Sequence, residues 1–174
     1  MKKVVTIFGS SKPTQNEEQY VTAYQIGKQL ALKGFDVCTG GFNGIMEAAS
    51  KGAVEGGAEA IGVTVNLWGR SSNKYITKEI KCNSLLERIQ KLIELGNGFI
   101  VLQGGTGTLL ELAAVWEYIN KGLMHAKPIA CHSAIWKKIV SEMNEQMKLE
   151  GRNIDLVKTF DTTEQIVNYL QDNL

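Results

Sequence analysis

The chain has 174 residues, of which 44% are hydrophobic and 21% are charged, and this composition excludes an intrinsically disordered chain. Nineteen basic residues face 18 acidic ones for a formal net charge of +1, so the basic excess typical of nucleic-acid-binding domains is missing and we expect no nucleic-acid partner. No apolar run approaches the ~20 residues that span a bilayer, and the first apolar stretch is too short for a signal peptide, so we expect no membrane partner either.

The cysteines and histidines give no sign of a metal site. Cys38, Cys82 and Cys131 are scattered and form no CxxC pair, which argues against a zinc knuckle or a disulfide framework and suits a reducing, cytoplasmic location. His125 and His132 have no third ligand at a recognisable spacing. We therefore expect no metal.

Short apolar runs alternate with helical patterns along the whole chain. The first predicted elements are a strand at 4–8, a helix that Asn16 caps and Gly34 ends, a strand at 35–39, a helix at 45–55 and a strand at 60–65, followed by a long loop at 66–81. After the loop we expect a helix at 84–95, a strand at 98–102 and a helix at 108–120. The last predicted elements are a strand at 128–131, a helix at 133–149, a strand at 154–160 and a final helix capped by 161–164. Trp68 falls in the long loop, where stacking on a base is one role and a lid or packing role is the more common one.

A strand followed by a helix, repeated about six times, is typical of an α/β fold with a doubly wound parallel sheet and helices on both faces. We expect one domain over 1–174 in a three-layer αβα arrangement. In such a sheet the ligand binds beyond the carboxyl ends of the strands, so the loops that follow strands are the candidates for a site.

Three of those loops are rich in glycine or small polar residues: Gly9-Ser10-Ser11, Gly40 to Gly44, and Gly104 to Thr108. Each lies between a strand and a helix, where free backbone N–H groups and the helix macrodipole favour an anion such as phosphate. Ordinary turns are the alternative for any single loop. The predicted phosphate- and substrate-binding residues are Ser10, Ser11, Gly41, Gly44, Gly104, Gly105, Thr106, Gly107 and Thr108.

The common nucleotide signatures do not fit these loops. A P-loop needs a lysine after its last glycine, and the NAD-binding fingerprint needs a third glycine in GxGxxG. Both are missing, so a P-loop ATPase and a typical NAD-binding domain are disfavoured. A GxSxG elbow is missing as well, which disfavours a serine hydrolase triad.

Two charged residues near the predicted helix starts have competing interpretations. Thr108-x-x-Glu111 has the spacing of a capping box, which would explain Glu111 without any function. Arg88 lies soon after Ser84, where a cation opposes the helix macrodipole. It is either a surface arginine paired with an acid such as Glu87 or a functional residue placed against local preference.

The loops together resemble a known family. The run from Gly40 to Ala49, the run from Gln103 to Glu111, the arginine-bearing helix start at 84–88 and the opening Phe8-Gly9-Ser10-Ser11 are similar, in the same order, to the LOG-like proteins, the cytokinin riboside 5′-monophosphate phosphoribohydrolases and their bacterial relatives. The run at 103–111 resembles their PGGxGTxxE motif.

The resemblance implies a Rossmann-like fold and hydrolysis of the N-glycosidic bond of a nucleoside 5′-monophosphate to free base and ribose 5-phosphate. It implies that Arg88 and Glu111 are the catalytic pair and that Gly104 to Thr108 bind the phosphate. It also implies a homodimer with active sites near the interface, and no metal or redox cofactor.

The chain departs from the family pattern at several positions. Gln103 replaces the proline of the motif, Leu110 replaces a common acid, and the histidine and lysine that often flank the arginine are missing around Arg88. The catalytic pair is retained, and the base remains open. A related branch contains molybdenum-cofactor carrier proteins, so a carrier that binds a nucleotide or cofactor without hydrolysis is the alternative.

Overall fold

The computed structural model describes residues 2–66, 69 and 71–174 and contains one parallel sheet of seven strands in the order β4-β3-β2-β1-β5-β6-β7. The strands are β1 (Val4–Phe8), β2 (Asp36–Thr39), β3 (Ala60–Val65), β4 (Lys78–Cys82), β5 (Gly98–Val101), β6 (Ile129–His132) and β7 (Val157–Phe160). The helices are α1 (Glu18–Leu32), α2 (Ile45–Glu55), α3 (Leu85–Leu95), α4 (Thr106–Asn120), α5 (Ala134–Leu149) and α6 (Thr163–Asn173).

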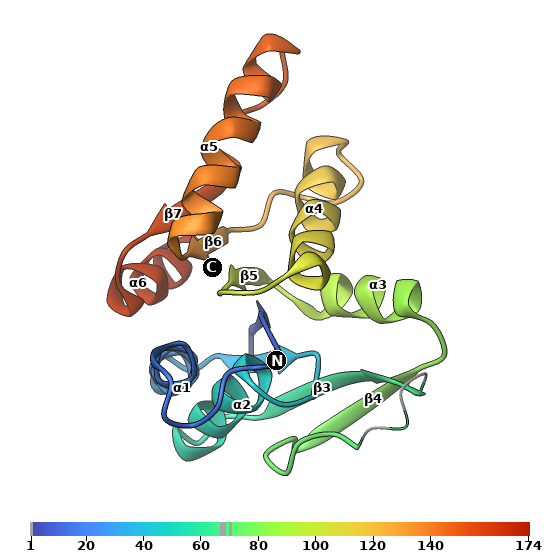
Figure 1. The fold of residues 1–174 in the computed structure, drawn as a ribbon, viewed down its shortest axis with the longest axis vertical. Helices are drawn as coiled ribbons and strands as arrows, with labels where there is room; N and C mark the ends of the chain where they lie inside the picture. The colour runs from blue at the N-terminus through green and yellow to red at the C-terminus, as the bar shows by residue number, and fades with distance from the viewer. Residues whose placement is uncertain (1, 67–68, 70) are drawn as a thin grey trace.

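Helices cover both faces of the sheet, which confirms the predicted three-layer, Rossmann-like α/β fold. One core packs α1, α2 and α6 against side chains such as Val5 and Ile7 of β1. The other packs α3, α4 and α5 against side chains such as Phe8 and Phe99. Figure 1 shows the sheet between these two groups of helices. Because strand side chains alternate between faces, one short apolar strand supplies both cores.

The predicted loop at 66–81 is wrong at its C-terminal end, because Lys78–Cys82 forms the edge strand β4. This strand is polar, its first two residues are exposed, and among the described residues β3 is its one partner at the edge of the sheet. Edge strands tolerate charged residues that discourage pairing with other chains, so the apolar signal of the buried strands is missing here. Trp68 lies outside the described residues.

Two predicted helix starts also differ from the structure. The N-cap of α1 is Glu17 rather than Asn16, and its side chain caps no helical N–H. Helix α4 begins at Thr106, earlier than the predicted Thr108, with Gly105 as its N-cap. Ser84 caps α3 as predicted, since its hydroxyl accepts a hydrogen bond from the Glu87 N–H.

Candidate active site at the carboxyl ends of β1 and β5

Strand β1 lies in the middle of the sheet and pairs with β2 on one side and with β5 on the other. Strands β2 to β4 extend the sheet on the first side and β5 to β7 on the second, so β1 marks the point where the strand order switches. At this switch point the three predicted loops meet. The N–H of Ser10 donates to the carbonyl of Gln103, 2.9 Å away, and the carbonyl of Ser10 accepts from the N–H of Ile45, also at 2.9 Å. The loop after β1 is therefore bonded to the loop after β5 and to the start of α2.

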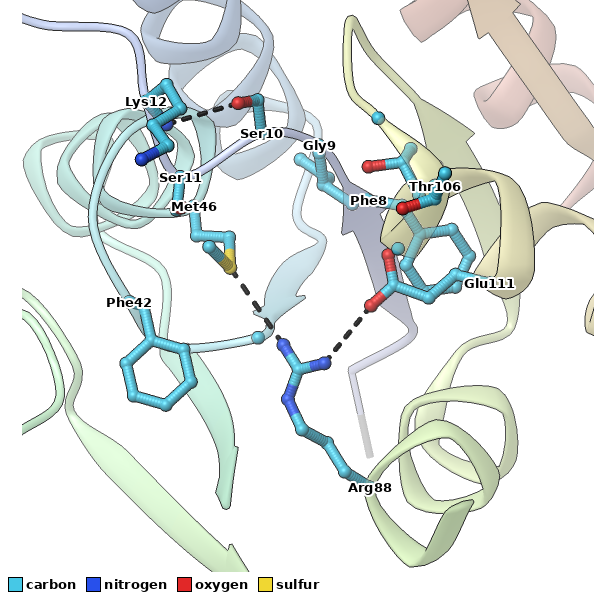
Figure 2. A pocket seen from close by; sticks show the side chains of 15 residues that line it. Phe8, Gly9, Ser10, Ser11, Lys12, Phe42, Met46, Arg88, Thr106 and Glu111 are labelled. Atoms are coloured by element: carbon cyan, nitrogen blue, oxygen red, sulfur yellow. Dashed lines mark hydrogen bonds and ion pairs between the residues drawn. The ribbon is translucent and has the colours of Figure 1, made fainter. Parts of the chain in front are cut away.

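A cavity of about 440 Å³ opens between these loops, a size within the usual range for small-molecule sites. Figure 2 shows the side chains that line it. The lining residues are Ile7, Phe8, Gly9, Ser10, Ser11, Lys12, Gly40, Phe42, Met46, Arg88, Gly105, Thr106, Gly107, Thr108 and Glu111.

Arg88 is held by the protein on several sides of its guanidinium. It lies in α3 but is only 6% exposed, because its side chain turns toward the sheet. Its Nε donates to the carbonyl of Val63 at 2.8 Å, its Nη1 donates to Oε1 of Glu111 at 3.2 Å, and its Nη2 lies 4.0 Å from Sδ of Met46. The surface pairing with Glu87 that the sequence left open is therefore wrong, and the partner of Arg88 is Glu111.

Gly40 makes room for this arginine. A Cβ atom on Gly40 would stand 1.7 Å from Nη2 of Arg88 and 2.7 Å from Sδ of Met46. Real Cβ atoms do not approach so closely, so any larger residue here would displace the guanidinium. The glycine after β2 thus sets the position of a side chain that comes from α3.

Glu111 is 8% exposed and lies beyond the first turn of α4. Because the helix begins at Thr106, Thr108 is not its N-cap and the capping-box explanation of Glu111 is wrong. Burial raises the pKa of Glu111 to about 7, although the Arg88 guanidinium acts to lower it. The carboxyl group is thus poised between its acid and its carboxylate near neutral pH, which is a common property of catalytic acids and bases.

The start of α4 presents backbone donors at the cavity. Gly105, Thr106 and Gly107 are exposed, and the bond from the Leu109 N–H to the Gly105 carbonyl closes the first turn of the helix. The N–H groups of Thr106, Gly107 and Thr108 precede that bond and have no acceptor within the helix. An anion bound there would also be stabilised by the macrodipole.

Two glycines of this turn are not required by packing. A Cβ on Gly105 or on Gly107 would meet nothing within 4 Å, and neither has a positive φ. Gly104 differs, since a Cβ there would stand 2.1 Å from Oγ1 of Thr108. Glycine at 105 and 107 therefore leaves open space above the helix start, where a ligand can approach the backbone closely.

The remaining predicted site residues, Gly41, Gly44 and Gly104, are not among the residues that line this cavity. Gly44 has a φ of 70° and packs against the backbone of Ser10 and Ser11. A Cβ atom on Gly44 would stand only 2.5 Å from the carbonyl oxygen of Ser10. Gly41 has a φ of 77°, and its carbonyl accepts from the N–H of Asn73 at 2.8 Å. Gly104 lines a neighbouring cavity with Ser10. These glycines shape the loops that carry the lining residues.

Sequence reasoning missed several lining residues, among them Lys12, Phe42 and Met46. Each lies inside a predicted loop or within two residues of one, and that proximity was the available signal. Asn73 was missed as well. Its Nδ2 donates to the carbonyls of Gly41 and Phe42, which ties the segment before β4 to the second glycine loop.

Within the described ranges, no group of three or more His, Cys, Asp or Glu side chains is placed to hold a metal ion. Among the same residues, no helix combines the length and the apolar character needed to cross a bilayer.

Comparison with known protein families shows which family the chain belongs to. The family model described as SLOG cluster4 matches residues 2–162. The chain belongs to the SLOG cluster4 family. The resemblance to LOG-like proteins is thereby confirmed.

Curated relatives of this SLOG chain bear enzyme names. The pyrimidine/purine nucleotide 5′-monophosphate nucleosidase of Escherichia coli K12 is 32% identical over 106 residues, covering 56% of this chain and 23% of that protein. The rice cytokinin riboside 5′-monophosphate phosphoribohydrolase LOG is 31% identical over 131 residues, covering 74% of this chain and 53% of that protein. The chain thus spans about half the length of the rice relative and less of the bacterial one.

Solved structures share the SLOG fold over nearly the whole chain. The molybdenum cofactor binding protein of Rippkaea orientalis superposes with a TM-score of 0.80 and 20% identity, covering 99% of this chain and 97% of that one. At this identity the likeness concerns the fold.

Proposed function

We propose that this protein hydrolyses the N-glycosidic bond of a nucleoside 5′-monophosphate, producing a free base and ribose 5-phosphate. One observation carries the proposal: a buried Arg88–Glu111 pair lies in the same cavity as the exposed start of α4. The names of the relatives support the same class of reaction.

The start of α4 is suited to bind the 5′-phosphate. The N–H groups of Thr106, Gly107 and Thr108 and the hydroxyl of Thr106 supply donors, and Gly105 and Gly107 leave space for the anion. Glu111 follows Thr106 by about 7.5 Å along the helix axis. A phosphate held at the helix start would therefore place the ribose alongside Glu111. Binding energy from this remote group would fix C1′ for attack.

Glu111 is the candidate for the reacting centre. Cleavage of the ribose–base bond builds positive oxocarbenium character on the sugar, which a nearby carboxylate stabilises. The same carboxylate can accept a proton from the water whose oxygen bonds to C1′, while the electron pair of the broken C–N bond leaves with the base, which takes up a proton. A pKa near 7 suits a group that exchanges protons at neutral pH.

Arg88 orients Glu111 and compensates its charge. Val63, Glu111 and Met46 engage three of the five N–H donors of the guanidinium, and Arg88 also lines the cavity, so the other two N–H groups are candidates to reach a ligand there. Those donors would support the leaving base or a sugar hydroxyl as charge develops.

The test is base release from AMP, CMP, GMP and isopentenyl-AMP by the purified protein, followed by chromatography. We expect release from at least one of them, and loss of that release in Glu111→Gln, which keeps the size of the side chain. Wild-type-like release by Glu111→Gln would remove Glu111 from the reaction. Release from none of the four would contradict the hydrolase.

A carrier that binds a nucleotide or a molybdenum cofactor without hydrolysis is the second candidate. It is favoured by the missing histidine and lysine around Arg88. A carrier would bind ribose 5-phosphate or AMP in calorimetry and release no base, so the same preparation separates the two functions.

We propose that the protein forms a homodimer through the groove between α4 and α5. This groove of about 530 Å³ is mostly apolar, and Leu109 and Met143, at its edges, are 40% and 43% exposed. Leu109 follows Thr108 directly in α4, so a second copy seated here would lie next to the active site. Sedimentation velocity should show a dimer for the wild type and a monomer for Met143→Asp. Leu32→Asp on α1, where the leucine is 70% exposed, is the control that should stay dimeric.

A further inference from the structure

The charges of the candidate site are unequally compensated. Among the residues that the structure describes, two cationic ones, Arg88 and Lys12, line the cavity. Arg88 is buried and in contact with the Glu111 carboxyl at 3.2 Å, so ionised Glu111 cancels its charge. Lys12 is exposed, and within the part of the chain that the structure describes its ammonium has no hydrogen-bond or ion-pair partner.

The proposed ligand carries more charge than the start of α4 compensates. A phosphate monoester bears about −1.5 to −2 charges at neutral pH. A helix N-terminus is equivalent to about +0.5 of a charge. About one negative charge or more is left on a phosphate bound at α4 when Glu111 is ionised and cancels the charge of Arg88.

Lys12 lies where it can meet that charge. Its backbone N–H donates to Oγ of Ser10 at 3.1 Å, which sets the turn after β1. Figure 2 shows Lys12 at the rim beside Ser10 and Ser11, with Thr106 of α4 on the other side of the cavity. Lys12 and Gly104 also line the same adjoining cavity of about 230 Å³, so the lysine borders the turn that leads into α4. The flexible stem of a lysine allows its ammonium to close over an anion.

We propose that Lys12 is the specificity-determining residue for the 5′-phosphate, closing on the phosphate at the start of α4 and selecting nucleotides over nucleosides. This inference rests on the proposed site for a nucleoside 5′-monophosphate, and it applies whether or not the bond is hydrolysed.

Calorimetry with ribose 5-phosphate tests the proposal on the wild type, Lys12→Gln, Lys12→Arg and Lys33→Gln. Lys33 is an exposed lysine at the C-terminal end of α1 and is the matched control. We expect the dissociation constant to rise about tenfold in Lys12→Gln, as for the loss of one hydrogen bond to a charged group, and to return toward wild type in Lys12→Arg. The kcat/KM for AMP relative to adenosine should fall by a similar factor in Lys12→Gln.

Two results would overturn the proposal. One is an unchanged affinity of Lys12→Gln for ribose 5-phosphate. The other is an equal loss of kcat/KM for AMP and for adenosine, which a merely structural role would cause. Weaker binding in Lys12→Gln with no base release from the wild type would support Lys12 and contradict the hydrolase. Base release by the wild type, together with an unchanged affinity of Lys12→Gln for ribose 5-phosphate, would support the hydrolase and contradict the role of Lys12.

Discussion

Nη1 of Arg88 lies 3.2 Å from Oε1 of Glu111, and this contact joins α3 to α4 in the interior of the protein. The two residues are 6% and 8% exposed. Taking two charges out of water is costly, and a buried pair is often no better for stability than apolar residues of the same volume. The pair lies in a cavity that the start of α4 also lines, and this placement points to chemistry more than to stability.

The rate of base release should rise with pH through about 7. Glu111 has a pKa raised by burial to about 7, and the proposed mechanism needs its carboxylate, which forms as the pH rises through that value. The measurement is kcat/KM for AMP between about pH 5 and pH 9, with the second ionisation of the substrate phosphate, pKa about 6, accounted for. A flat profile across neutral pH would contradict the role of Glu111 as the ionised group.

Arg88→Ala should destabilise the fold more at alkaline than at acidic pH. The folded-state pKa of Glu111 already lies above the ordinary glutamate value of 4.5, so its ionisation disfavours the folded state as the pH rises from 4.5 toward 7. Without Arg88 this pKa rises further, and the loss grows toward about 3–5 kcal/mol when an uncompensated charge is forced into the interior.

Urea unfolding at about pH 5 and about pH 8 measures this difference. The double variant Arg88→Ala/Glu111→Gln is the control, because it has no buried carboxyl group to titrate. If Arg88→Ala lost the same free energy of unfolding at both pH values, the coupling between the two residues would be refuted.

Gly40→Ala should lower base release by about 100-fold while the protein still folds. The new Cβ would collide with Nη2 of Arg88 and Sδ of Met46, both of which are ends of side chains that can move aside. A displaced guanidinium no longer orients Glu111. Thermal unfolding and initial rates, measured on the same sample, separate the two effects, and a wild-type rate would show that Gly40 does not position Arg88.

Gly107→Ala should stabilise the protein by up to about 1 kcal/mol and weaken the binding of ribose 5-phosphate. Gly107 lies in α4, where alanine is the better helix former, and its Cβ would meet nothing within 4 Å. The methyl group would occupy the space through which a phosphate reaches the backbone. Ser141→Ala, at an exposed position of α5, is the control that should leave binding unchanged. Unimpaired binding by Gly107→Ala would place the phosphate elsewhere.

The order of elements could be read from the chain because it depends on local patterns. Near-continuous apolar runs such as Val4–Phe8 mark buried parallel strands, and the glycines that follow them mark the loops at the carboxyl edge of the sheet. The three loops were therefore placed together correctly, and Ser84 was identified as an N-cap from its immediate neighbours. The polar edge strand Lys78–Cys82 lacks such a pattern, and its strand character comes only from pairing with β3.

The sequence alone determined a parallel α/β sheet with anion-suited loops at one edge, since apolar periodicity and glycine turns act over a few residues. Only the tertiary structure decided where Arg88 and Glu111 lie and what they contact. By local rules Arg88 was either a surface arginine or a functional residue, and the capping box of Thr108 explained Glu111. The earlier start of α4 and the packing of α3 on the sheet bury both in one cavity, and burial sets their pairing and the pKa of Glu111. Burial depends on which distant segments pack together, which no stretch of sequence specifies by itself.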